Sequence, residues 1–186
     1  ACIFGALTGA HFNPALTIAL ALDGQVDWAN VPIYAISQLL GAFCGAVIVY
    51  ILFKDHYEET SNEPETVRGT FCTAPSIPNT FRNLFSEIVG TFILVFAIIG
   101  FGNVGGAATA GVDKIFVYGL IVSIGMSLGG LTGYAINPAR DLGPRLAFAV
   151  LPFTNKADPN WGYAWIPIVG PIIGGVLAVI LFNFIF

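Results

Sequence analysis

The segment TGAHFNPA at residues 8–15 recurs as TGYAINPA at residues 132–139. Thr, Gly, Asn, Pro and Ala stand at the same places in both copies, and such agreement is hard to obtain by chance. An internal repeat of this kind indicates that the chain consists of two related halves. In membrane proteins built from such halves the functional site lies where the halves meet, so we expect it at these two segments.

The composition predicts a protein that spans a membrane. Hydrophobic residues make up 56% of the chain and charged residues 10%, whereas roughly a quarter of the residues in a soluble domain are charged. Crossing the hydrocarbon core takes about 20 apolar residues in a helix. Runs without Asp, Glu, Lys or Arg reach this length at residues 29–53, 88–112, 115–139 and 159–186.

The same composition excludes two other kinds of site. The chain has no basic stripe, so nucleic acid is not expected as a partner. His11 and His56 have no cluster of Cys or carboxylate residues around them, so no metal site is expected.

The two halves differ in length. Candidate spans at about residues 81–100 and 114–130 precede Asn137, whereas only twelve residues precede Asn13. If the halves were once equivalent, one helix and most of a second are missing at the N-terminal end, and an intact version would have six spans and two shorter pieces. We expect one domain over residues 1–186, with 1–53 as the remainder of the first repeat, 54–80 as a solvated connecting loop and 81–186 as the second repeat.

The Asn-Pro pairs predict two short helices inside the membrane. Asn is a favoured helix N-cap, and Pro suits the first helical position because its missing N–H would have no partner there. The helix that begins at Asn13 ends near Asp23, and the one that begins at Asn137 ends before Pro152, so neither can cross a bilayer. Non-helical backbone within a membrane survives only where protein or water satisfies its polar groups. Two such helices therefore predict a water-filled lumen.

Two helix N-termini that meet in the membrane suit a path for neutral solutes. Each carries roughly half a positive charge from its aligned peptide dipoles, which repels cations and protons. The side-chain amides of Asn13 and Asn137 can donate hydrogen bonds to a passing oxygen atom. Carbonyl groups on either side form the expected ladder of acceptors, at Gly9, Ala10, His11, Phe12, Gly133, Ala135 and Ile136. Neutral hydroxylated molecules match this pattern and ions do not.

The doubled motif resembles the paired signature of the major intrinsic proteins, the aquaporins and aquaglyceroporins. The resemblance covers the whole chain and centres on Asn13, Pro14, Ala15, Asn137, Pro138 and Ala139. It implies an all-α integral membrane protein, an aquaporin-type right-handed helical bundle with an inverted repeat and two re-entrant half-helices, here without its N-terminal helices. It also implies a passive channel rather than an enzyme, with one pore per subunit, no cofactor, and a homotetramer in the plasma membrane.

The family resemblance also implies a selectivity filter, of which three residues can be placed. Arg140 matches the arginine that donates hydrogen bonds to the solute and opposes cations. Gly125 matches a position that is histidine in water-selective members, and Tyr134 one that is usually phenylalanine in glycerol facilitators. A glycine opens the constriction, and an aromatic ring offers an apolar wall to a polyol. The fourth filter residue belongs to the N-terminal part that the chain lacks, and Tyr in place of Phe departs from the pattern.

Further positions separate the subfamilies and imply a bacterial glycerol facilitator, namely Phe53, Asp141, Arg145, Pro167 and Ile168. A carboxylate at Asp141, in the first turn of a half-helix, also complements the helix dipole. The implied solutes are glycerol, water and other small neutral molecules. The alternatives are a channel for urea, ammonia or lactic acid, and a mainly water-selective aquaporin.

Two polar residues within apolar stretches are interpreted as structural. An ionisable residue inside a membrane is by default a functional candidate. The resemblance nevertheless suggests that Glu87 accepts hydrogen bonds from the non-helical segment before Asn137 and braces it, rather than relaying protons. Gln38 is expected to brace the first half. An intramembrane enzyme would need a nucleophile beside a base, and an ion-coupled transporter would need carboxylates in the lumen; the repeat centre offers Asn instead.

Two further expectations concern packing and orientation. Gly41 with Gly45, and Gly170 with Gly174, form small-xxx-small pairs that let helices approach closely. The positive-inside rule would make the side with most of the Lys and Arg residues cytoplasmic. The family places that side outside, and we follow the family because Arg140 and Arg145 are expected to belong to the pore.

Overall fold

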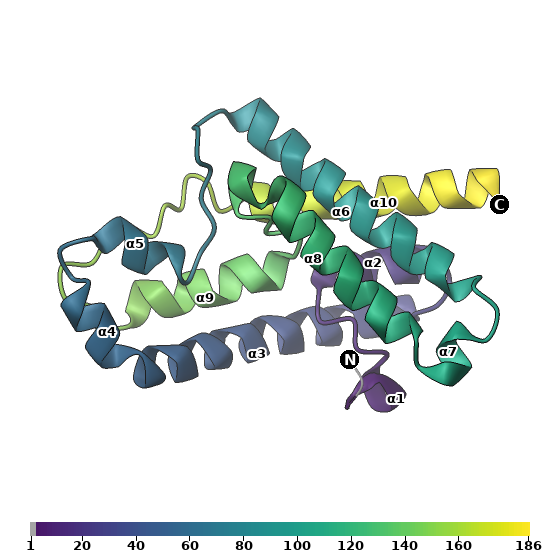
Figure 1. The fold of residues 1–186 in the computed structure, drawn as a ribbon, viewed down its shortest axis with the longest axis horizontal. Coiled ribbons are helices and arrows are strands. Elements are labelled where there is room, and N and C mark those ends of the chain that lie inside the picture. Colours follow the sequence, from purple (N-terminus) through teal and green to yellow (C-terminus); the bar gives the residue numbers. More distant parts are fainter. Residues whose placement is uncertain (1–2) are drawn as a thin grey trace.

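The computed structural model describes residues 3–186, and these form helices and connecting segments with no strand among them (Figure 1). The helices in chain order are α1 (Gly5–Thr8), α2 (Pro14–Leu22), the short 3-10 helix η1 (Trp28–Asn30), α3 (Val31–Leu52), α4 (Lys54–Glu59), α5 (Pro64–Gly69), α6 (Thr80–Gly102), α7 (Ala107–Ala110), α8 (Asp113–Thr132), α9 (Pro138–Val150) and α10 (Ile166–Ile185).

Four helices are long and apolar enough to cross a membrane, which confirms the predicted spans. They comprise α3 with the preceding η1 (Trp28–Leu52), α6, α8 and α10, each of 20 residues or more. The chain is therefore a multi-pass membrane protein. The predicted span at residues 114–130 was too short by one residue at its start and by two at its end.

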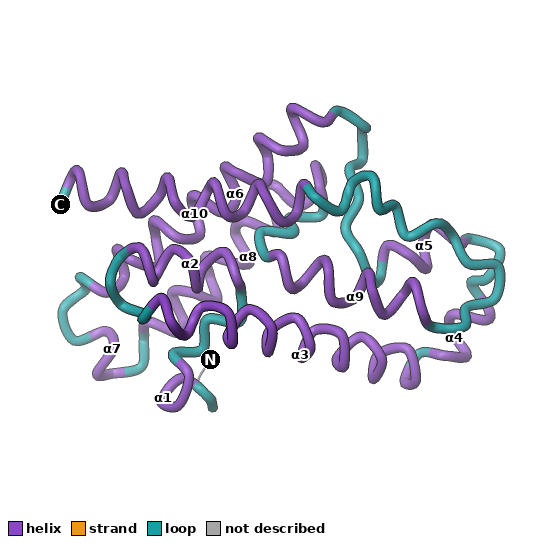
Figure 2. The backbone as a smooth tube through the Cα atoms, turned by 180° about the vertical axis from the view of Figure 1, so that it is seen from behind, coloured by secondary structure: helices purple, strands orange, loops and turns teal. Residues whose placement is uncertain are grey.

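The two helices that follow the repeated motif are short. Helix α2 has 9 residues and α9 has 13, which at 1.5 Å per residue gives lengths of about 14 Å and 20 Å. Both are shorter than the roughly 30 Å hydrocarbon core. Figures 1 and 2 show that α2 and α9 point away from each other from the middle of the molecule, with α3 on one side and α6 and α10 on the other.

Glycine residues allow the long helices to pack closely around the short ones. A Cβ atom added at Gly174 of α10 would lie 2.3 Å from the Ile88 carbonyl oxygen of α6, so the two backbones are in contact there. At Gly143 of α9 it would lie 2.6 Å from Cβ of Ala42 on α3. No described atom lies within 4 Å of a Cβ added at Gly41 or Gly45, and among the described residues α3 approaches α9 at Ala42. The close helix packing expected at Gly41 and Gly45 stays a prediction.

The connecting segment, predicted to be a solvated loop, is partly helical and partly buried. It contains α4 and α5, and its residues Val67, Phe71 and Cys72 pack with Phe148 of α9 in a buried cluster. Phe153 extends this cluster, with its ring edge-on to Phe71 and tilted against Phe148. Burial raises the pKa of the Cys72 thiol to about 11. The burial was not predicted, because the apolar residues of this segment stand among many charged ones. Their contact partners also lie about 80 positions further along the chain.

Candidate functional site

Each copy of the motif begins a helix with the same N-terminal cap. Asn13 and Asn137 have extended backbone angles (φ −153° and −159°), and Pro occupies the first turn that follows each. Oδ1 of Asn13 accepts hydrogen bonds from the N–H groups of Ala15 and Leu16, at 2.9 Å and 3.4 Å. Oδ1 of Asn137 accepts from Ala139 and Arg140, at 3.0 Å and 3.2 Å. The side chains thus satisfy two of the N–H groups that a helix start leaves unpaired.

The two caps are joined to each other by reciprocal hydrogen bonds. Nδ2 of Asn13 donates to the Ile136 carbonyl at 2.7 Å, and Nδ2 of Asn137 donates to the Phe12 carbonyl at 2.9 Å. The N-termini of α2 and α9 therefore face each other at the centre of the molecule. Because a primary amide has two N–H donors, each Asn keeps one N–H beyond this cross-link.

The segments before the two Asn residues have non-helical backbone. Their backbones include left-handed residues on both sides, with φ of 69° at Gly9, 56° at Ala10, 74° at Gly133 and 42° at Ile136. The carbonyls of Phe12 and Ile136 already accept from the Asn amides. Within residues 3–186, no hydrogen-bond donor reaches the carbonyls of Gly9, Ala10, Gly133 or Ala135. Ala135 is buried, with 1% of its surface exposed, so the carbonyls of Gly9, Ala10 and Gly133 remain as the candidate acceptors for a solute.

Glu87 holds the second of these segments. It lies on α6 and is 1% exposed. Its Oε1 accepts from the Thr132 hydroxyl at 2.7 Å and from Ala135 N at 3.0 Å, and its Oε2 accepts from Ile136 N at 2.7 Å. Both carboxylate oxygens are thus bonded to the loop that leads into Asn137.

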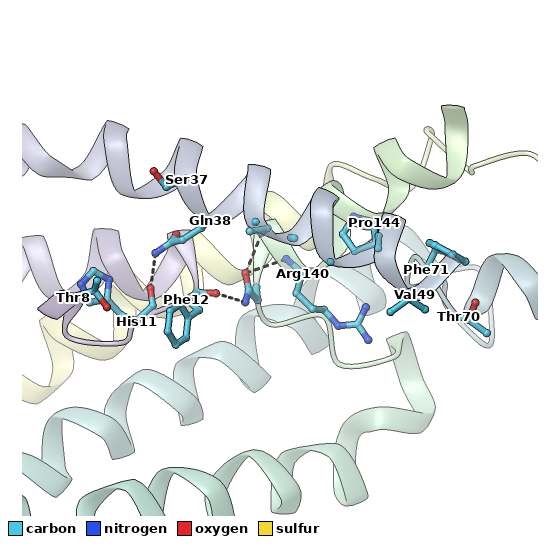
Figure 3. A pocket seen from close by; sticks show the side chains of 16 residues that line it. Thr8, His11, Phe12, Ser37, Gln38, Val49, Thr70, Phe71, Arg140 and Pro144 are labelled. Atoms are coloured by element: carbon cyan, nitrogen blue, oxygen red, sulfur yellow. Dashed lines mark hydrogen bonds between the residues drawn. The ribbon is translucent and has the colours of Figure 1, made fainter. Parts of the chain in front are cut away.

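Gln38 of α3 occupies a comparable place in the first half. Its Nε2 donates to the His11 carbonyl (Figure 3) and also to the Thr17 hydroxyl. The Thr17 oxygen also lies 2.8 Å from Nδ1 of His11 and donates to the Asn13 carbonyl at 3.0 Å. Sequence reasoning missed Thr17, although its position four residues after Asn13 allows its hydroxyl to reach that carbonyl.

Two of the three predicted filter residues, Gly125 and Tyr134, lie side by side. The Tyr134 ring rests on α8, where a Cβ added at Gly125 would lie 3.1 Å from Cζ and one added at Gly129 would lie 3.0 Å from Cδ1. The space left by the missing side chain at Gly125 is therefore partly filled by Tyr134. Gly129, which the sequence analysis did not single out, forms the other half of this seat one helical turn away.

Arg140 extends its side chain into a large open cavity. The cavity has a volume of about 650 Å³ and is bordered by Phe12, Gln38, Gly45 and Asn137. Figure 3 shows the guanidinium pointing away from α9 into this space. Within residues 3–186 it forms no hydrogen bond or ion pair, so its donors are free for a solute.

Asp141 and Arg145 form a buried ion pair next to Arg140. Both side chains are 0% exposed, and Nε and Nη2 of Arg145 lie 2.9 Å from the Asp141 carboxylate. Arg145 also donates to the carbonyls of Thr73, Pro159 and Asn160. The expectation that Arg145 belongs to the pore is therefore wrong, because its guanidinium is fully used in joining α9 to two loops.

The remaining subfamily-discriminating residues lie away from this cavity. Phe53 ends α3, and its ring meets His56 edge-on at 5.7 Å. Pro167 is buried in the first turn of α10, and Ile168 follows it half-buried. None of the three lines the cavity that receives Arg140.

Comparison with known proteins identifies relatives for nearly the whole chain. A family model described as major intrinsic protein matches residues 1–182. A glycerol uptake facilitator protein of Bacillus subtilis is 51% identical over 96% of this chain, and a probable glycerol uptake facilitator protein of Thermotoga maritima is 48% identical over 99%. The matches cover 64% and 77% of those two proteins, so the chain spans less than two thirds of the first.

A solved structure has the same fold. The X-ray structure of the aquaglyceroporin from Plasmodium falciparum superposes with a TM-score of 0.79 at 31% sequence identity, covering 96% of this chain and 74% of that one. These relatives confirm the family that the doubled motif suggested.

Proposed function

The chain belongs to the major intrinsic protein family, and we propose that it forms a passive membrane channel for glycerol, water and other small neutral solutes that excludes ions and protons. The reciprocal bonding of Asn13 and Asn137 carries this proposal. It sets two helix N-termini against each other and leaves one N–H of each amide for a passing oxygen. The bacterial relatives that bear the name glycerol uptake facilitator support the choice of solute.

Charge selectivity follows from the direction of the two short helices. Helices α2 and α9 each present an N-terminus, with roughly half a positive charge, to the same point. The guanidinium of Arg140 adds a full charge nearby. A cation on this path would lose much of its hydration shell and meet two repulsive regions in series. A neutral solute meets the same groups only as hydrogen-bond donors, with the unpaired carbonyls of Gly9, Ala10 and Gly133 as acceptors.

The preference for glycerol rests on the filter. A polyol presents hydroxyl groups on one edge and carbon atoms on the other. Arg140 and the carbonyls before Asn137 suit the hydroxyl edge, and the Tyr134 ring suits the carbon edge. The seat formed by Gly125 and Gly129 lets this ring lie back against α8, so that aromatic surface borders the path without blocking it.

Glu87 and Gln38 act as braces in this proposal. The left-handed residues before each Asn are energetically unfavourable for most side chains, so they persist only when the surroundings hold them. The bonds from Ala135 and Ile136 to Glu87 hold one segment, and the bond from Gln38 to the His11 carbonyl holds the other. A proton relay would need a second titratable group within reach of Glu87, and each of its described hydrogen-bond partners is a hydroxyl or a backbone N–H.

The assembly in the membrane is part of the same proposal. Several large apolar side chains on the outer side of α8 are exposed in the single chain, among them Ile115, Tyr118 and Met126. We assign this face to lipid or to neighbouring subunits of a homotetramer, the arrangement that the family resemblance implies.

Stopped-flow light scattering on vesicles that contain the full-length protein tests the function. After an inward glycerol gradient is applied, the vesicles should shrink and then recover volume faster than protein-free vesicles. With sucrose they should shrink and stay shrunken. A glycerol recovery no faster than that of protein-free vesicles would contradict the proposal.

A further inference from the structure

A short buried segment of the connecting loop lies against the filter. Phe71, Cys72 and Thr73 are 2%, 1% and 5% exposed, although the segment that precedes them is largely exposed. Phe71 and Cys72 belong to the apolar cluster under α4 and α5. Thr73 is the last residue of this buried segment, and it has both polar contacts and an apolar one.

Thr73 is bound to the first turn of α9. Its backbone N–H and its hydroxyl both donate to Oδ1 of Asp141, at 2.8 Å and 2.6 Å, and its carbonyl accepts from Nη2 of Arg145 at 2.8 Å. Asp141 directly follows Arg140 in the sequence. A shift of Thr73 therefore moves the helical turn from which the Arg140 side chain extends.

Thr73 also contacts the loop that carries Tyr134. A Cβ added at Gly133 would lie 3.2 Å from both Cβ and Cγ2 of Thr73, so the threonine side chain occupies the space beside that glycine. Gly133 directly precedes Tyr134 and has a left-handed backbone (φ 74°). The hydroxyl of Thr73 thus faces Asp141, the neighbour of Arg140. Its methyl group faces Gly133, the neighbour of Tyr134.

From these contacts we infer that Thr73 is a positioning residue that sets the distance between Arg140 and Tyr134, and through it the width of the filter. The inference rests on the proposed channel function. The hydroxyl bond fixes the Arg140 side, because it ends on a carboxylate that is buried and charged, and such bonds are stronger than neutral ones. The methyl group acts on the Tyr134 side, because Thr73 occupies the space in which a side chain at position 133 would stand and so lies against the backbone that leads into Tyr134.

Two substitutions separate the two contacts. Thr73→Val keeps the shape of the side chain and removes the hydroxyl donor from Asp141. Thr73→Ser keeps the donor and removes the methyl group that lies beside Gly133. Thr66→Val is the matched control, because Thr66 is in the same connecting segment and is exposed, and its hydroxyl donates to the Glu63 carboxylate at 3.1 Å rather than to α9.

The experiment compares polyols of increasing size in vesicles that contain the full-length protein. The measured quantity is the permeability to a four-carbon polyol divided by that to glycerol, which does not depend on the amount of inserted protein. Thr73→Val should change this ratio by about threefold or more, as expected when a bond to a charged group is lost. Thr73→Ser should raise the ratio, and Thr66→Val should leave it as in the wild type.

An unchanged ratio in both Thr73 variants overturns the inference. If Thr73→Val does not insert as folded protein, Thr73→Ser decides alone, and an unchanged ratio in that variant is equally decisive against it. Failure of the channel proposal would be visible separately, because wild-type vesicles would then be no more permeable to glycerol than protein-free ones.

Discussion

Replacing Arg145 with Met should destabilise the protein by about 3–5 kcal/mol, the usual cost of removing one partner of a buried ion pair. The wild-type guanidinium is fully buried, holds Asp141 through two bonds of 2.9 Å, and donates to the carbonyls of Thr73, Pro159 and Asn160. Met has a similar length but no donor. In the variant, Asp141 keeps only the two bonds from Thr73, and its buried negative charge loses its counterion.

Thermal unfolding of the purified full-length protein in detergent measures this effect. With 2–4 °C for each kcal/mol, the expected fall in Tm is on the order of 10 °C. Lys54→Met is the control, because Lys54 and Glu58 have the same i,i+4 spacing at 3.7 Å, but both are 57% exposed. Such a surface pair contributes about 0–1 kcal/mol. Equal melting temperatures for the two variants would refute the claim that burial makes the Asp141–Arg145 pair important.

The other predictions concern transport. Gly125→His should lower glycerol permeability more than water permeability, because a Cβ there would lie 3.1 Å from the Tyr134 ring and the imidazole must take space from the filter; an equal loss of both in vesicle assays would count against it. Glu87→Gln should lower the yield of folded protein without changing selectivity. The new NH2 group would face a backbone N–H that now donates to the carboxylate, which costs about 1–3 kcal/mol. Normal folding with an altered pH response would favour a proton relay instead. Arg140→Val should admit a small cation or proton leak in planar bilayers while neutral flux stays similar or rises; an unchanged conductance would place the charge barrier at the helix N-termini alone.

The parts of the structure that depend on short-range sequence were predictable. Asn followed by Pro determines where α2 and α9 begin, because the cap needs only a side-chain oxygen and the next two or three N–H groups. The long spans were visible as charge-free runs. The facing of the two caps could be expected because the motif occurs twice. The hydrogen bonds from Asn13 to the Ile136 carbonyl and from Asn137 to the Phe12 carbonyl were not predicted, since both carbonyls were expected to accept from a solute.

The parts that depend on contacts between distant segments were not predictable. Asp141 and Arg145 have a spacing that suits an ion pair on one helix, but nothing in the sequence indicates that Thr73 and the carbonyls of Pro159 and Asn160 bury it. Gly129 resembles any other glycine of α8 until the Tyr134 ring is seen beside it. Gly41 and Gly45 show the converse. The pattern permits a close approach of another helix, but it does not determine which helix packs there.

The central claim is that the path past Asn13 and Asn137 carries neutral solutes and excludes ions. The most direct test records glycerol flux and ionic conductance in parallel on membranes that contain one preparation of the full-length wild-type protein. The account predicts a glycerol flux that rises with the amount of protein while the conductance stays at the value of the protein-free membrane. A conductance that rises in proportion to the protein, or a glycerol flux that does not, would contradict it.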